Sequence, residues 1–152
     1  MRRHLALMTI AVLGGSVLVA HVWAQPPWVQ APGRAGQGFQ GYWMGVDPVD
    51  GGDSRRSLLQ VGNGRFALAA RDSILTLCDG TDRGFASFND GVVVGRNVME
   101  SNNLTIQCFN NGASVALRVR YELVGNGVML EDTTTQDGTP VSTILFHRVS
   151  RE

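Results

Sequence analysis

Three carboxylates lie close together between residues 47 and 53, in a spacing that could bind a metal ion. Asp47, Asp50 and Asp53 surround the glycine pair Gly51-Gly52. Hard cations such as calcium take oxygen ligands from flexible loops of this kind. The spacing does not match an EF-hand loop, and Asp and Gly are also the residues of an ordinary surface turn. We therefore expect a solvated turn, with these three aspartates as weak candidates for a calcium site.

His147 is the one histidine that follows the first 24 residues. A catalytic triad needs a histidine that is oriented by an acid and placed next to a nucleophile. Ser142 and Ser150 lie in no recognisable nucleophile motif, and no two acids are singled out as a pair for glycoside hydrolysis. The sequence therefore predicts no enzyme, no catalytic residue and no cofactor.

Two pairs of arginines could bind an anion. Arg55 and Arg56 are adjacent, so in a strand they face opposite sides, and we expect them to form ion pairs with nearby aspartates. Arg118 and Arg120 share one face of a predicted strand, and they would select carboxylates if that face lined a cavity. The opposite face is apolar and needs the interior, so we expect Arg118 and Arg120 on the outside.

The first residues have the order of a secretory signal. Arg2 and Arg3 are followed by the apolar run Leu5–Ala20 and by Val22-Trp23-Ala24, which suits a signal peptidase. The apolar run is about 16 residues long, whereas a membrane-spanning helix needs roughly 20. We expect residues 1–24 to be a cleaved signal peptide, with a retained single anchor as the alternative. The mature protein would then be periplasmic or extracellular, from a bacterium, with no membrane anchor after cleavage.

Cys78 and Cys108 are the two cysteines of the chain. An even number of cysteines in an oxidising compartment favours a disulfide, which here would close a loop of about 30 residues. The alternatives are two buried thiols or half of a metal site. His147 alone makes a weak case for the metal.

The composition predicts one folded domain that follows a polar N-terminal segment, which we call the lead-in. Cleavage after Ala24 leaves 128 residues, which is enough for one domain with its own core. These residues hold 11 arginines against 13 acidic residues, a balance that gives no reason to expect a nucleic-acid partner. Residues 25–40 are rich in Pro, Gly and Gln and are predicted to be flexible. The folded domain is expected to span residues 41–152.

Turn signals and alternating side chains predict an all-β domain. Asn-Gly and Asp-Gly pairs, which supply the positive φ angles of tight hairpins, recur along residues 50–138. Between Ser114 and Leu123, apolar and charged residues alternate with period two. Short connections favour an antiparallel up-and-down meander of about 8–10 strands. Closure into a barrel would remove the two exposed edges, and a β-sandwich is the alternative.

The motif Gly41-Tyr42-Trp43 at the start of the first predicted strand, with Arg148 on the last, resembles the calycin group of barrels. This group includes lipocalins, avidins and small periplasmic metalloprotease inhibitors. The resemblance implies that Gly41 and Trp43 open the first strand at the closed end of a barrel. It also implies that Arg148 packs across the indole, where a cation–π contact is favourable.

Three classes of function remain open. A non-catalytic binding protein would hold an unknown small ligand at the open end of the barrel. A docking protein, such as a protease inhibitor, would bind another exported protein through residues 25–40, where Trp28 is an aromatic anchor. Trp28 and Tyr42 are thus the candidate contacts for a ligand or partner. An enzyme ranks third.

Overall fold

The structure is a computed structural model that describes residues 36–74, 76–78 and 84–151. The expected signal peptide and residues 25–35 of the expected lead-in lie outside these ranges. No helix in the described ranges is long and apolar enough to cross a membrane. The elements in chain order are β1 (Gly41–Val46), β2 (Asp53–Gly62), β3 (Arg65–Asp72), the 3-10 turn η1 (Thr76–Cys78), β4 (Gly84–Val93), β5 (Val98–Cys108), β6 (Ser114–Gly125), β7 (Val128–Thr135) and β8 (Pro140–Ser150).

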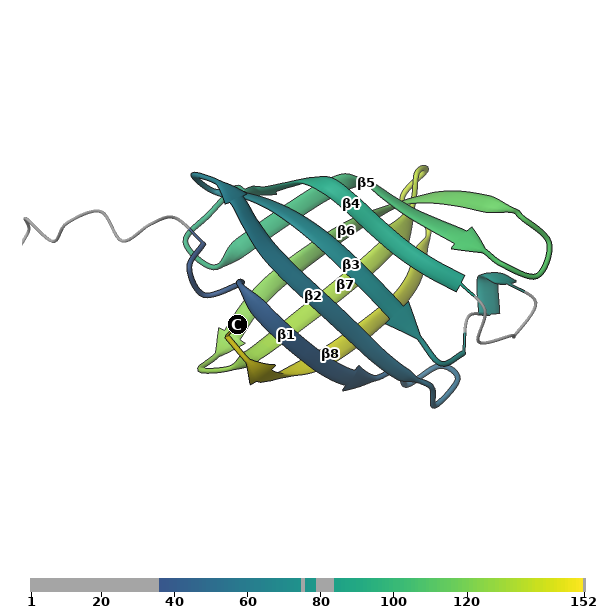
Figure 1. The fold of residues 1–152 in the computed structure, drawn as a ribbon, viewed down its shortest axis with the longest axis horizontal. Coiled ribbons are helices and arrows are strands. Elements are labelled where there is room, and N and C mark those ends of the chain that lie inside the picture. Colours follow the sequence, from purple (N-terminus) through teal and green to yellow (C-terminus); the bar gives the residue numbers. More distant parts are fainter. Residues whose placement is uncertain (1–35, 75, 79–83, 152) are drawn as a thin grey trace, which may run out of the picture. The chain divides into compact units, whose positions relative to one another are not determined.

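The eight strands form one closed antiparallel barrel in sequence order (Figure 1). Every strand pairs with its neighbours in the chain, and β1 also pairs with β8, which places Trp43 opposite Arg148. Closure leaves no unpaired sheet edge. The predicted all-β barrel is confirmed, and the structure is not a β-sandwich.

Alternation in the sequence decides which side chains fill the barrel. On β6, Leu117, Val119 and Tyr121 are buried, whereas Arg118 between them is exposed. The same period of two runs through the buried positions of the other strands, because successive side chains in a strand point to opposite faces. Arg118 and Arg120 thus lie outside the barrel, as their pattern predicted.

One end of the barrel, which we call the closed end, is filled by residues that precede β1. Phe39 is fully buried, and its ring meets that of Phe66 edge to face, with the ring centroids 6.1 Å apart. Residues 36–40 therefore extend the packed unit on the N-terminal side of the expected start at Gly41. A single phenylalanine in a window of glycine and glutamine leaves no periodic signal, so composition placed it in the lead-in.

Trp43 and Arg148 join this segment to the barrel. The Trp43 indole Nε1 donates a hydrogen bond of 2.9 Å to the carbonyl oxygen of Phe39. The Arg148 guanidinium carbon lies 4.4 Å from the centroid of the Trp43 ring, and Nη2 donates to the carbonyl oxygen of Gly38. This is the geometry that the resemblance implied for the two side chains.

Gly41 allows β1 to leave the closed end beside the last residues of β8. Its φ angle is +135°, which side chains rarely adopt, and a Cβ there would collide with the carbonyl oxygen of Ser150. The β1–β8 register also shifts between Tyr42 and Trp43. A glycine is therefore needed where the first strand meets the last.

Candidate functional site

A cavity of about 280 Å³ lies inside the opposite end of the barrel, which we call the open end. This end carries the β1–β2, β3–β4, β5–β6 and β7–β8 connections, and η1 lies there, away from the C terminus (Figure 1). The walls of the cavity are mainly apolar. The cavity opens to solvent beside Val49, whose side chain is 67% exposed. The lining residues are Asp47, Val49, Asp50, Arg56, Asp72, Ile74, Leu77, Ala86, Leu104, Ile106, Leu117, Glu131, Thr133, Pro140, Val141, Ser142 and Ile144.

A buried ion pair between β2 and β7 lies at the bottom of this cavity. Arg56 Nε donates to Glu131 Oε2 over 2.7 Å, and Arg56 Nη2 donates to Glu131 Oε1 over 2.8 Å. Arg56 is 4% exposed and Glu131 is 1% exposed. The bidentate geometry fixes both side chains, because two parallel bonds hold the planar guanidinium against the carboxylate.

Asp72 at the end of β3 completes the cluster. Arg56 Nη1 donates 2.6 Å to Asp72 Oδ1 and 3.0 Å to the carbonyl oxygen of Arg55. Burial is the largest single influence and lowers the pKa of Arg56, but the charge and hydrogen bonds of Glu131 and the charge of Asp72 together outweigh it and raise the pKa well above its ordinary value. The three side chains form what we call the Arg56 cluster, in which the arginine stays charged.

Two aromatic residues border the Arg56 cluster. The Arg56 guanidinium carbon lies 4.9 Å from the ring centroid of Phe146 on β8. The Tyr121 hydroxyl is buried beside Glu131 and Arg56. Burial raises the pKa of Tyr121 well above its ordinary value, and the negative charge of Glu131 adds to the rise, so the hydroxyl stays protonated.

Two of the three candidate calcium ligands, Asp47 and Asp50, accept hydrogen bonds within their own turn. Asp47 Oδ1 accepts a hydrogen bond from the Val49 amide, and Asp50 Oδ1 accepts one from the Gly52 amide. At Asp53 it is the backbone amide that is bonded, to the hydroxyl of Ser73. No group of three histidine, cysteine or acidic side chains in the described ranges is placed to hold a metal ion.

Asp47 nevertheless contributes negative charge at the mouth of the cavity. Burial is the largest influence on its carboxyl and raises its pKa above the ordinary 3.8, and the charges of Asp50, Asp72 and Glu131 raise it further. The hydrogen bond from the Val49 amide works in the opposite direction but does not cancel these effects. Acidic side chains from three strands or turns therefore face one another across the open end.

Asp47→Asn should raise the free energy of unfolding at pH 7. The raised pKa means that folded Asp47 holds its proton more tightly than unfolded Asp47, so stability falls as pH rises from 3.8 through the folded value. The asparagine side-chain oxygen can still accept the hydrogen bond from the Val49 amide, and an uncharged side chain removes the loss of stability at pH 7. Urea unfolding at pH 7 and pH 3 should show an advantage at pH 7 that disappears at pH 3.

Asp137→Asn is a control of the opposite sign. The Thr135 hydroxyl lowers the pKa of Asp137 by donating to its carboxylate, so this variant should lose stability at pH 7 and match the wild type at low pH. An Asp47→Asn variant that is less stable than the wild type at pH 7 would contradict the expected effect of burial.

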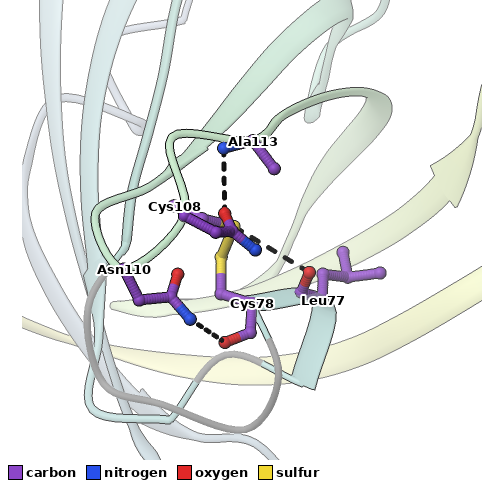
Figure 2. Close-up of a disulfide and its surroundings, with 6 residues drawn as sticks. Leu77, Cys78, Cys108, Asn110 and Ala113 are labelled. Carbon is purple, nitrogen blue, oxygen red and sulfur yellow. Dashed lines mark hydrogen bonds between the residues drawn. A yellow bond between two sulfur atoms is a disulfide. The ribbon is translucent and has the colours of Figure 1, made fainter.

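The disulfide between Cys78 and Cys108 fastens the rim of the cavity. It joins η1 to the last residue of β5, and this confirms the predicted pairing (Figure 2). Asn110 Nδ2 also donates 3.2 Å to the carbonyl oxygen of Cys78, and the neighbouring residue Leu77 lines the cavity. The bond therefore holds the β3–β4 connection against β5.

Two other candidate residues, Tyr42 and His147, lie away from the cavity. Tyr42 is half-buried on the outer face of β1, beside Arg55 and Phe85. His147 is exposed on the outer face of β8. Neither side chain joins the Arg56 cluster. Trp28 lies outside the described residues.

Sequence reasoning missed the Arg56 cluster. It expected Arg56 to pair with nearby aspartates, but its partners are Asp72 at the end of β3 and Glu131 in the middle of β7, which is 75 residues away. A signal was present, because Arg56 is two residues from the inward Leu58, and Glu131 lies between the inward Met129 and Thr133. A charged residue in phase with buried neighbours on two strands indicates an interior ion pair.

No protein-family model matches the chain, and no curated protein matches it. Among solved structures, a redesigned β-barrel is similar, with a TM-score of 0.54 and 18% sequence identity, covering 77% of this chain and 96% of that chain. At this identity the likeness shows the fold alone. It supports a closed β-barrel, and membership of the calycin group stays a prediction.

Proposed function

We propose that this chain is an exported, non-catalytic binding protein that holds a small ligand in the open-end cavity. The observation that carries the proposal is an apolar-walled cavity with a buried, oriented ion cluster at its base. Its volume of about 280 Å³ is close to the lower limit of ligand sites, which run from roughly 300 to 1,000 Å³. A ligand of this site is a small molecule.

The Arg56 cluster supports a binding role because a barrel core does not need it. Replacing a buried ion pair by apolar side chains of similar volume is often neutral or stabilising. Apolar ligand sites, in contrast, contain a few polar groups that fix the orientation of the ligand. The charged groups are held by one another in fixed positions, which suits recognition of a ligand.

The export signal and the disulfide support the location. Residues 1–24 have the order of a cleaved signal, and a disulfide persists in oxidising compartments such as the periplasm and the extracellular space. The docking role for residues 25–40 rests on Trp28, which lies outside the described residues. It therefore remains the alternative that the sequence alone suggests.

Ala86→Phe should abolish ligand binding. Ala86 is buried on β4 and lines the cavity, so a benzyl side chain there would fill the space that the ligand needs. Ala116→Phe is the matched control, because Ala116 is exposed on the outer face of β6. The measurement is an NMR titration of isotope-labelled protein with a panel of small compounds that each have an apolar body and one polar group.

The wild type and Ala116→Phe should respond to the same compounds, with chemical-shift changes at Leu117, Ile144 and other cavity residues. Ala86→Phe should give no response at those residues while retaining the dispersed spectrum of a folded protein. Equal binding to Ala86→Phe, or a panel in which no compound shifts the cavity residues, would refute the proposal.

A further inference from the structure

We propose that the ligand of the open-end cavity is a small cation, an ammonium compound with an apolar body whose nitrogen binds the carboxylate of Asp72. This inference rests on the proposed function and specifies the class of ligand. It follows from the charges around the cavity, from the use of the Arg56 hydrogen bonds and from the apolar walls.

Negative charges outnumber positive charges among the described residues that line the cavity. Arg56 is the one basic residue of this set, and Asp47, Asp72 and Glu131 oppose it. Two negative charges are therefore in excess when these groups are ionised. Asp50 also lines the rim but is engaged in a further interaction, so it is not needed for the excess. A cation entering the cavity gains from this field, and an anion is repelled.

Arg56 has little hydrogen-bonding capacity left for a ligand. A guanidinium has five N–H groups. Nε and Nη2 each donate to Glu131, and Nη1 donates to Asp72 and to the carbonyl oxygen of Arg55. A carboxylate ligand would therefore have to break the ion pair with Glu131 before it could bind Arg56 in the bidentate manner.

The free hydrogen-bonding capacity of the Arg56 cluster lies on the carboxylate of Asp72. An ionised carboxylate has about four acceptor sites. In the described part of the chain, Asp72 accepts one hydrogen bond, through Oδ1, and its side chain is 12% exposed. Ser54, which pairs with Asp72 across β2 and β3, has a buried hydroxyl without a hydrogen-bond partner among these residues. The Asp72 carboxylate therefore favours a ligand that donates hydrogen bonds, and the Ser54 hydroxyl can accept a further one.

The walls determine the rest of the ligand. Leu104, Ile106, Leu117 and Ile144 surround the space above the Arg56 cluster with aliphatic surface. No three acidic, histidine or cysteine side chains of the described chain are grouped to hold a metal ion. An organic cation matches this cavity, because its charged nitrogen can bind the carboxylate and its apolar body can pack against the aliphatic walls. A bare metal ion would find neither a set of three ligands in the described chain nor a use for the apolar walls.

The test compares three probes of similar shape with different charges: benzylammonium, benzyl alcohol and benzoate. Calorimetric or NMR titration at pH 7 should show that the wild type binds benzylammonium at least about tenfold more tightly than benzyl alcohol, and benzoate more weakly than either. Asp72→Asn should remove most of this preference by weakening the binding of benzylammonium.

Asp132→Asn is the matched control. It makes the same change in net charge on the outer face of β7, where Asp132 accepts a hydrogen bond from Thr143, and it should keep the full preference. If benzyl alcohol or benzoate binds at the cavity residues as tightly as benzylammonium, the ligand class is wrong although the binding function stands. If none of the three probes shifts the cavity residues, the cationic class is overturned, and the wider compound panel then decides the binding function.

Discussion

Replacing Arg56 with methionine is expected to lower the free energy of unfolding by about 3–5 kcal/mol. The substitution leaves Glu131 at 1% exposure without its bidentate partner, and removing one member of a buried ion pair costs this much because the remaining charge is uncompensated. Methionine conserves most of the apolar stem, so lost packing is a minor part of the effect. Urea unfolding followed by circular dichroism measures the change.

The double variant Arg56→Met/Glu131→Leu should recover most of the loss, because neither buried charge remains. Arg120→Met is the control on the outside of the barrel. Its partner Glu122 is 2.8 Å away, but the Arg120 side chain is 41% exposed, and exposed pairs contribute about 0–1 kcal/mol. If Arg56→Met lowers the free energy of unfolding no more than Arg120→Met does, Arg56 and Glu131 do not form the buried ion pair that the structure shows.

Removing the disulfide is the second large effect. Cys78→Ala/Cys108→Ala should lower the free energy of unfolding by about 3–4 kcal/mol, because the bond closes a loop of 30 residues in the unfolded chain. The barrel should still fold, since its core consists mainly of strand residues far from the bond. Thermal unfolding with and without reductant, followed by circular dichroism, gives the same comparison for the wild-type chain.

The reduced protein should keep its strand content at low temperature and melt earlier. The largest loss of order should be at η1, since the disulfide ties that turn to β5. Identical melting of the oxidised and reduced chains would show that the bond adds nothing to stability. A reduced chain that does not fold at all would show that the barrel core is weaker than its size suggests.

The barrel could be predicted from the sequence because its signals are local. The alternation from Ser114 to Leu123 needs only neighbouring residues to show which face is buried, and turn glycines such as Gly64 and Gly127, both with positive φ, mark the hairpins. Short connections then leave few topologies. The cysteine pair was predictable for a different reason, since two cysteines have only one possible pairing.

The Arg56 cluster could not be predicted in the same way because Arg56 and Glu131 meet only after the barrel closes. Arg56 and Glu131 lie on strands that are not neighbours in the barrel, so no hairpin register relates them. A charged residue considered alone is also predicted to be exposed, because charged side chains are rarely buried without a partner. Phe39 shows the same limit at the other end, where one aromatic side chain fills the barrel from a segment without strand pattern.

The most direct test of the central claim is native mass spectrometry of the protein recovered from its own exported fraction without reductant. Wild type and Ala86→Phe should be expressed and recovered side by side. We predict that the wild type carries a small bound molecule containing a basic nitrogen and that Ala86→Phe carries none. A bare wild-type chain, or the same bound mass on both proteins, would contradict a ligand site in the open-end cavity.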